Sequence, residues 1–186
     1  EMMNGRVKTL HPKIHAGILA RRDQDMEILQ QRGYETIDLV VVNLYPFKET
    51  IAQNCSFDEA IEKIDIGGPT MIRSAAKNFK DVAVVSNPSD YSRLIQEWEN
   101  GDGISYDFRK ELSQKVFETM ADYNLSISNY LKGESDNSIP NYSIEKSSSL
   151  RYGENPHQTA NLFTFSNLEQ KNIANSDILQ GKELSY

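Results

Sequence analysis

The segment "LVVVNLY", residues 39–45, is a continuous apolar run that stops at Pro46. Such a run is typical of a strand buried on both faces of a parallel sheet. A second run, "VAVVS" at 82–86, is followed closely by Pro88 in the same way. Parallel neighbours need a long crossover connection between them, and the residues that separate these two runs are numerous enough to supply one. The two runs therefore predict parallel strands of one sheet.

Helical patterns lie between and after these strands. Ser56 with Glu59 three positions on forms a capping box ahead of "AIEKI". The next helix is predicted to open at Pro69, and another follows Pro88. A long helix is predicted over 108–131, with an apolar stripe at helical spacing. The stripe comprises Leu112, Val116, Met120, Tyr123 and Ile127. This order of elements predicts an α/β fold with right-handed crossovers.

The composition changes after residue 131. "GESDNSIPNYSIEKSSS" is polar and rich in Ser and Asn, so we interpret 132–149 as a linker between a first domain, 1–131, and the beginning of a second, 150–186. "RYGENPHQ", just after it, is typical of a turn with many hydrogen-bonding side chains. Because a doubly wound sheet needs more than two strands, further strands are expected ahead of residue 1.

Charge and composition exclude several classes of function. The chain has 186 residues and a formal net charge of -7, so we expect no nucleic-acid binding over a broad surface. A single cysteine, Cys55, excludes an internal disulfide framework and a Cys-rich metal site. There is no apolar run of about 18 residues, so no membrane span is expected. With no secretory signal at the start, a cytoplasmic location is expected.

"RVKTLHPKIHAGIL", residues 6–19, places cations beside an apolar segment. Arg6, Lys8 and Thr9 offer a guanidinium fork, a point charge and a hydroxyl within four residues. Such a set can hold a phosphate or a carboxamide. The alternative is a solvated loop.

Two histidines in the same stretch have the i, i+4 spacing of helical zinc ligands. His11 and His15 are nevertheless separated by Pro12, which is expected to interrupt a helix, and no third ligand is near. We therefore expect no metal here, and a positional role for His11 or simple packing is preferred.

"NLYPF", residues 43–47, continues from the first strand. Ligands of open α/β sheets bind at the carboxyl ends of strands, so Asn43 and Tyr45 are candidates for polar groups in a pocket. The alternative is that Tyr45 packs, with its hydroxyl reaching water.

"IDIGGPTMIRSAAKN", residues 64–78, is the most informative stretch. The Gly67–Gly68 pair after Asp65 permits close backbone approach. A helix from this turn aims its free amide groups back at whatever the turn holds. Arg73 and Lys77 are like charges at i, i+4 and repel each other, and a nearby negative charge such as Asp65 or a bound anion would reduce this repulsion. We therefore expect Asp65 and Lys77 to approach each other across the glycine turn; the alternative is a solvated helix face.

Four stretches together match one known family in order and spacing: "GRVKTLHPKIHAGILARR", "DLVVVNLYPF", "IDIGGPTMIRSAAKN" and "LRYGENPHQTA". The chain resembles the bifunctional enzymes of purine biosynthesis in which IMP cyclohydrolase is joined to AICAR transformylase. The resemblance covers nearly the whole chain. It implies a methylglyoxal-synthase-like parallel sheet with flanking helices, lacking its N-terminal strands, over 1–131. From about residue 150 it implies the start of an α/β transformylase domain.

The reaction that the resemblance implies closes a purine ring. The carboxamide nitrogen of formyl-AICAR attacks the formyl carbon, and loss of water gives IMP. This chemistry needs substrate folding and proton transfer rather than a metal or redox cofactor. In the full-length protein, 10-formyltetrahydrofolate would be the co-substrate that formylates AICAR.

The resemblance also implies roles for individual residues. Lys77 is implied as the proton-transferring group, with Asp65, while Lys8 and Tyr45 would stabilise charge on the reacting oxygen. The implied nucleotide contacts are Arg6, Val7, Lys8, Thr9, Asn43, Leu44, Asp65, Ile66, Gly67 and Gly68, with Arg151 and Tyr152 for AICAR in the second domain.

Some family features are absent or altered. The family's N-terminal phosphate-binding segment would lie ahead of Glu1, and the catalytic Lys-His pair of the transformylase would lie beyond Tyr186. Phe79 stands where relatives often carry histidine. Besides an enzyme acting on small nucleotides as a homodimer, two alternatives stay open. One is a nucleotide-binding regulatory module of the same fold, and the other is an inert fragment.

Overall fold

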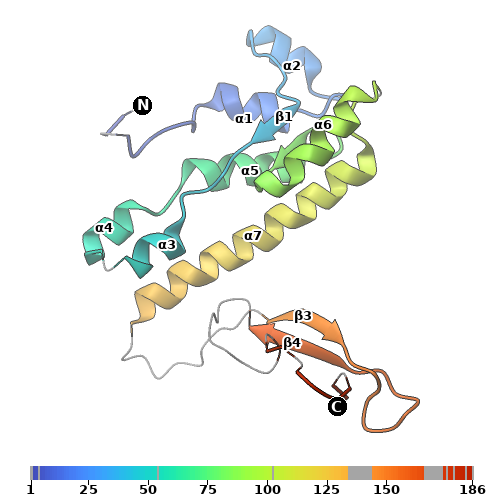
Figure 1. The fold of residues 1–186 in the computed structure, drawn as a ribbon. Helices are drawn as coiled ribbons and strands as arrows, with labels where there is room; N and C mark the ends of the chain where they lie inside the picture. The colour runs from blue at the N-terminus through green and yellow to red at the C-terminus, as the bar shows by residue number, and fades with distance from the viewer. Residues whose placement is uncertain are drawn as a thin grey trace. The chain divides into compact units, whose positions relative to one another are not determined.

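The structure of the chain is a computed structural model, which describes residues 2–3, 5–53, 55–101, 103–133, 144–165, 174, 176–177, 179–182 and 184–185. The chain divides into two compact units, Glu1–Leu131 and Lys132–Tyr186. Figure 1 shows the helices and strands of both. Each unit is described by itself below.

The first unit is α/β and contains a parallel pair of strands. β1 (Leu39–Val41) pairs with β2 (Ala83–Val85), with Val40 opposite Val84. Both strands and their parallel pairing are thus confirmed, although each is shorter than its apolar run. Past β1, the amide of Val42 still donates to the Val85 carbonyl at 3.0 Å before the chain turns away. β2 is buried throughout, whereas Val41 of β1 is 46% exposed, so burial on both faces is wrong for β1 in this chain.

Helices surround this pair. The predicted helices are present, and the Ser56–Glu59 capping box is confirmed, with both of its reciprocal hydrogen bonds. The helix predicted from Pro69 begins earlier, at Gly67. The helices are α1 (Pro12–Leu19), α2 (Met26–Gln31), α3 (Phe47–Ala52), α4 (Phe57–Glu62), α5 (Gly67–Lys77), the 3-10 helix η1 (Pro88–Asp90), α6 (Tyr91–Glu99) and α7 (Tyr106–Lys132).

As predicted, Pro12 keeps His11 and His15 off one continuous helix, although it does so by starting a helix and not by breaking one. Pro12 is the first residue of α1, where proline needs no amide partner and its fixed φ suits the helix. His11 caps this helix, because its Nδ1 accepts from the Lys13 amide at 3.1 Å. Helix α1 therefore carries His15 inside it.

α7 is the longest helix described in the first unit (Figure 1), and its contacts include α3, α5 and α6. The ring of Phe47 on α3 meets Tyr123 of α7 edge-on, with centroids 6.3 Å apart. The hydroxyl of Ser113 on α7 donates to the Ala76 carbonyl of α5 at 2.8 Å. Arg93 of α6 pairs with Glu111 of α7 at 2.8 Å. These contacts make α7 the support against which the other elements are fixed.

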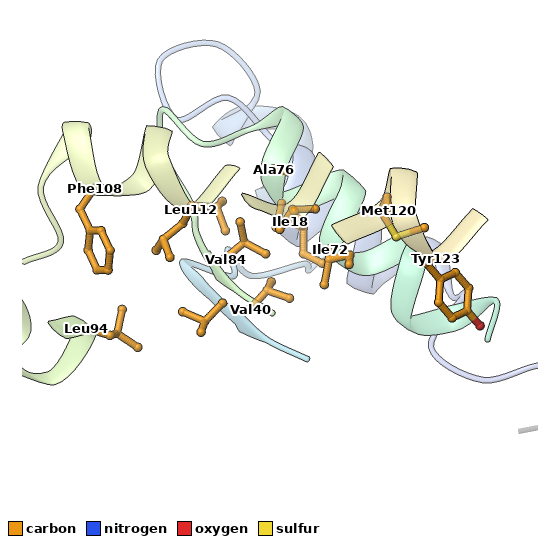
Figure 2. Close-up of a cluster of buried hydrophobic side chains, with 14 of the residues drawn as sticks. Ile18, Val40, Ile72, Ala76, Val84, Leu94, Phe108, Leu112, Met120 and Tyr123 are labelled. Atoms are coloured by element: carbon orange, nitrogen blue, oxygen red, sulfur yellow. The ribbon is translucent and has the colours of Figure 1, made fainter. Parts of the chain in front are cut away.

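The core lies between the strand pair and α7. Figure 2 shows Phe108, Leu112, Met120 and Tyr123 of α7 in one cluster with Val40, Val84 and Ile72. The predicted stripe of α7 is confirmed, with Ile127 partly buried at its end. The largest fully buried side chains are Phe47, Phe108, Ile18, Ile72, Leu112, Val82, Val84, Val85 and Val116.

A glycine in α1 allows the chain ahead of β1 to pack closely. A Cβ on Gly17 would lie 2.6 Å from the Glu35 carbonyl oxygen and 3.2 Å from Cγ1 of Ile37. The Ile37 amide also donates to the Gly17 carbonyl at 3.0 Å. The close approach therefore depends on the missing side chain.

We predict that Gly17→Ala lowers the free energy of unfolding by about 1–3 kcal/mol, because backbone has to shift to admit the methyl group. Without that clash, alanine would stabilise the interior of a helix by roughly 1 kcal/mol relative to glycine. Urea-induced unfolding therefore measures whether the free energy of unfolding falls or rises. A rise in Gly17→Ala would contradict the close packing at Gly17.

The second unit contains an antiparallel pair. β3 (Ile144–Ser149) pairs with β4 (Asn161–Phe165), with a register irregularity between Lys146 and Ser148. The linker predicted over 132–149 is therefore wrong at its C-terminal end. The sequence of β3 is polar and all its residues are exposed, so pairing with β4 rather than burial explains the strand. The rest of the predicted linker, from 134 to 143, lies outside the described residues. No helix in the described part of either unit is long and apolar enough to cross a membrane.

Candidate active site

The Gly67–Gly68 turn at the start of α5 is a meeting point of three segments. A Cβ on Gly67 would lie 2.6 Å from Oγ1 of Thr9 and 3.0 Å from the carbonyl oxygen of Lys8. The Lys8–Thr9 turn, far away in the sequence, therefore packs directly on the helix start. The close backbone approach that the glycine pair predicted is confirmed at Gly67.

Gly68 brings in the other two segments. Its Cβ would lie 2.5 Å from Oδ2 of Asp65 and 3.0 Å from Cδ2 of Leu44. The Leu44–Tyr45 segment leads from β1, so the residues at the carboxyl end of this strand face the helix start. This is the edge at which ligands of open α/β sheets bind.

The carboxylate of Asp65 is fixed by backbone amides. Oδ1 accepts from the Gly68 amide at 2.9 Å, and Oδ2 accepts from the Tyr45 amide at 3.4 Å. One of the free amides at the start of α5 is thereby satisfied. Each carboxylate oxygen keeps a further lone pair. Asp65 is half-buried, so a ligand can still reach it.

Tyr123 of α7 supports Asp65 from the core. Its Oη accepts a hydrogen bond from the Asp65 amide at 2.8 Å. Burial raises the pKa of Tyr123, and the Asp65 charge adds to this effect while the hydrogen bond opposes it. The phenol therefore stays neutral at working pH. The apolar stripe of α7 predicted only a packing role for Tyr123. The signal for this hydrogen bond was the presence of tyrosine at a position where leucine would pack equally well.

We predict that Tyr123→Phe lowers the free energy of unfolding by about 1–3 kcal/mol, because it leaves the Asp65 amide without its partner. Tyr130→Phe is the matched control, since Tyr130 also packs its ring edge-on against Phe47. Thermal or urea unfolding of the two variants measures the difference. Equal stability of both variants would show that the hydrogen bond to Asp65 contributes nothing.

Three residues of the segments that meet at this turn have exposed side chains. Lys8 is exposed, Tyr45 is 53% exposed and Ile66 is 55% exposed. Ile66 directly precedes Gly67, so it offers an apolar surface next to the Asp65 carboxylate. A flat, polar heterocycle could stack on this surface and meet the charged groups at its edge.

Other predicted contact residues lie around this face. Arg6 pairs with Glu62 at 3.4 Å, and both side chains are more than half exposed. Val7 forms an isolated bridge with Met2. The amide of Asn43 donates to Oη of Tyr91 at 3.3 Å, which directs Asn43 toward α6. The atoms nearest to the glycine turn belong instead to Lys8, Thr9, Leu44 and Asp65.

The expectation that Asp65 and Lys77 approach each other is wrong. Lys77 is the last residue of α5, while Asp65 precedes the first. A helix of this length, with a rise of 1.5 Å per residue, places them at opposite ends, about 15 Å or more apart. Lys77 is exposed. The guanidinium carbon of the other cation, Arg73, lies 5.8 Å from the centroid of the Phe117 ring. Asp65 therefore pairs with neither cation.

In the second unit, Arg151 and Tyr152 lie side by side, with the guanidinium carbon 5.3 Å from the ring centroid. The loop after them is closed by Gln158, whose carbonyl accepts from the Gly153 amide at 2.8 Å. An open pocket of about 820 Å³ is lined by Gly153, Glu154, His157, Gln158, Thr159 and Ala160. Among the residues described in both units, no cluster of three or more His, Cys, Asp or Glu could hold a metal ion.

Comparison with known proteins gives matches along the whole chain. The family model "MGS-like domain" matches residues 1–70, and the model "AICARFT/IMPCHase bienzyme" matches residues 75–186. The crystal structure of ForH is similar with a TM-score of 0.59 and 34% identity, over 70% of each chain. The α/β interpretation and the resemblance drawn from the four sequence stretches are thereby confirmed.

Several relatives carry the same name, bifunctional purine biosynthesis protein PurH. The protein from Clostridium botulinum (strain Okra / Type B1) is 50% identical over 188 residues, and that from Caldicellulosiruptor saccharolyticus is 52% identical over 196 residues. Each match covers 100% of this chain and 38% of the relative, so the chain spans well under half of their length. Because the bienzyme model covers more than half of the chain, the chain belongs to the AICARFT/IMPCHase bienzyme family.

Proposed function

We propose that the first unit carries an IMP cyclohydrolase site, which closes formyl-AICAR to IMP with loss of water, within a longer bifunctional protein. Membership of the bienzyme family and the PurH relatives support this proposal. The observation that carries it is that the backbone of Lys8, the backbone of Tyr45 and the carboxylate of Asp65 meet at the Gly67–Gly68 turn.

The reaction assigns a task to each of these groups. The carboxamide nitrogen forms a bond to the formyl carbon and loses a proton, while the formyl oxygen becomes negative. The oxygen takes up that proton and a second one from the formylamino nitrogen, and it leaves as water as this nitrogen forms the C=N bond. Asp65, held by two backbone amides, keeps lone pairs that accept the nitrogen's proton. The side chains of Lys8 and Tyr45 are exposed on the two segments that adjoin the turn, and we assign their ammonium and hydroxyl groups to stabilising the charge on the oxygen. The glycine turn lets the Lys8–Thr9 segment and Leu44 pack closely beside Asp65.

Truncation of Lys8 tests this assignment. We predict that Lys8→Ala in the full-length protein lowers kcat for cyclisation by about a hundredfold, because one group that stabilises the oxyanion is lost. Lys13→Ala is the matched control, since Lys13 is an exposed cation on α1 outside the site and its loss should change kcat less than twofold. Formation of IMP from added formyl-AICAR is the measurement. Equal kcat values for the two variants would remove Lys8 from the mechanism.

The resemblance predicts that Lys77 transfers a proton during cyclisation. The position of Lys77 at the far end of α5 from Asp65 does not support this role. The resemblance predicts a loss of turnover of about a hundredfold for Lys77→Ala with an unchanged melting temperature. The distance between Lys77 and Asp65 instead predicts that Lys77→Ala leaves turnover unchanged. A loss would show that substrate meets Lys77 in the assembled protein, and unchanged turnover would remove it from the catalytic set.

For the second unit we propose the beginning of the AICAR transformylase domain. The bienzyme match and the resemblance support AICAR contacts by Arg151 and Tyr152 and 10-formyltetrahydrofolate as co-substrate of the full-length protein. We keep 1–131 as the proposed first domain, and we propose that the second domain includes β3 and so starts before residue 150. We also propose that the full-length protein is a cytoplasmic homodimer.

A nucleotide-binding regulatory module is the second candidate. The match of the MGS-like model to residues 1–70 favours it, as does the distance between Lys77 and Asp65, since a sensor needs no proton relay. The two candidates differ in one assay. A wild-type full-length protein that binds IMP but does not convert formyl-AICAR would be a sensor, whereas turnover identifies the cyclohydrolase.

A further inference from the structure

The imidazole of His15 bridges two parts of the candidate site. Nε2 lies 3.2 Å from the carbonyl oxygen of Thr9, and Nδ1 lies 3.1 Å from Oγ of Ser74. His15 belongs to α1 and Ser74 to α5, and both are half-buried. The ring therefore ties the turn that carries Lys8 to the helix whose start carries Asp65.

The partners determine which ring nitrogen holds the proton. The carbonyl of Thr9 only accepts, so Nε2 of His15 must donate. The hydroxyl of Ser74 also lies 2.9 Å from the Thr70 carbonyl and can turn toward either partner. If Nδ1 is bare, Ser74 donates to it; if Nδ1 is protonated, it donates to Ser74, which then donates to Thr70. The hydrogen bond from His15 to Thr9 exists in both cases.

The Thr9 backbone needs such a restraint. Its φ is +55°, in the left-handed region that residues with a Cβ seldom adopt. Strain of this kind costs about 1–3 kcal/mol and persists only where the surroundings fix it. The hydroxyl of Thr9 donates to the Lys8 carbonyl at 2.7 Å, and the side chain lies against Gly67. Without His15, relaxation of Thr9 would redirect Lys8, its neighbour.

We propose that His15 is a positioning residue for the cyclohydrolase site: through Thr9, it holds Lys8 in the orientation that faces the reacting atoms beside Asp65. The inference rests on the proposed function for its kinetic consequence. Its structural part is that Nε2 of His15 donates a hydrogen bond to the Thr9 carbonyl in either state of Nδ1. This part does not depend on whether the protein is an enzyme.

The test compares variants of the full-length protein. We expect His15→Leu to lower kcat for cyclisation by about a hundredfold, as misplacement of a catalytic group by about 1 Å does, with KM changed less than threefold. His15→Gln, whose amide can still donate to Thr9, should recover at least about a tenth of the wild-type kcat. His11→Asn is the control: it keeps a capping side chain on α1, lies outside the site and should match wild type.

Two outcomes would overturn the inference: His15→Leu with wild-type kcat, or His15→Gln no better than His15→Leu. Should His15→Leu fail to fold, His15→Gln and Ser74→Ala decide. Ser74→Ala removes the hydroxyl that orients the ring and should lower kcat severalfold, and a wild-type kcat in both variants would refute the role.

A measurement without substrate separates this inference from the proposed function. ¹⁵N chemical shifts of the His15 ring in the full-length wild-type protein should show a protonated Nε2 across the pH range in which the protein is folded. A bare Nε2 would overturn the inference even if the enzyme is active. A wild-type protein that forms no IMP, with Nε2 protonated, would instead refute the proposed cyclohydrolase.

Discussion

Asp65→Asn in the full-length protein is expected to lower the turnover of formyl-AICAR by about a thousandfold. Asparagine keeps an oxygen that can accept the Gly68 amide, so the start of α5 stays capped. What is lost is a carboxylate able to take the proton from the attacking nitrogen, and such a group contributes roughly 10²–10⁴ in rate. Steady-state formation of IMP under saturating substrate is the measurement.

Two further variants make this result specific. Asp58→Asn removes an exposed carboxylate on α4 outside the site and should leave turnover within twofold of wild type. Asp65→Ala removes the cap as well as the charge, so its free energy of unfolding should fall by about 1 kcal/mol below that of Asp65→Asn. If Asp65→Asn retained more than a tenth of the wild-type turnover, Asp65 would not be the base.

Gly68→Ala is expected to lower cyclisation by about a hundredfold. The added Cβ would lie 2.5 Å from Oδ2 of Asp65 and 3.0 Å from Cδ2 of Leu44, so the carboxylate has to leave its position. Displacement of a catalytic group by about 1 Å is enough for a loss of this size. Turnover and circular dichroism of the variant should be measured together, to show that the helix is retained.

Gly67→Ala is the companion variant. Its Cβ would meet Oγ1 of Thr9 at 2.6 Å, which is the end of a side chain that can rotate, and the Lys8 carbonyl only at 3.0 Å. We therefore expect a smaller loss, of about tenfold. Wild-type turnover in both alanine variants would contradict the close packing of the three segments on this turn.

The sequence predicted those elements whose signals are local. The apolar run at 39–45 and the Ser56–Glu59 capping box led directly to β1 and α4. Pro12 was ambiguous, because proline both breaks a helix interior and favours the first turn, and its neighbours alone could not decide. β3 was missed, since a polar exposed strand lacks the alternation that identifies a half-buried one.

The candidate site was predicted in part. The glycine turn correctly indicated a close approach. The expected Asp65–Lys77 contact failed because a helix from this turn carries Lys77 to its far end, whether it begins at Pro69 or at Gly67. The supporting contacts of Tyr123 and His15 join residues 58 and 59 positions apart in the chain. Such contacts follow from the packing of α1, α5 and α7, which no local pattern specifies.

The most direct test of the proposed site is a crystal structure of the full-length protein with IMP bound. The account predicts that the purine base lies on Ile66 and the Gly67–Gly68 turn, with its polar edge within about 3.5 Å of groups of Lys8, Tyr45 or Asp65. A base bound elsewhere, with none of these three side chains within hydrogen-bonding distance, would contradict the assignment of the cyclohydrolase site to the start of α5.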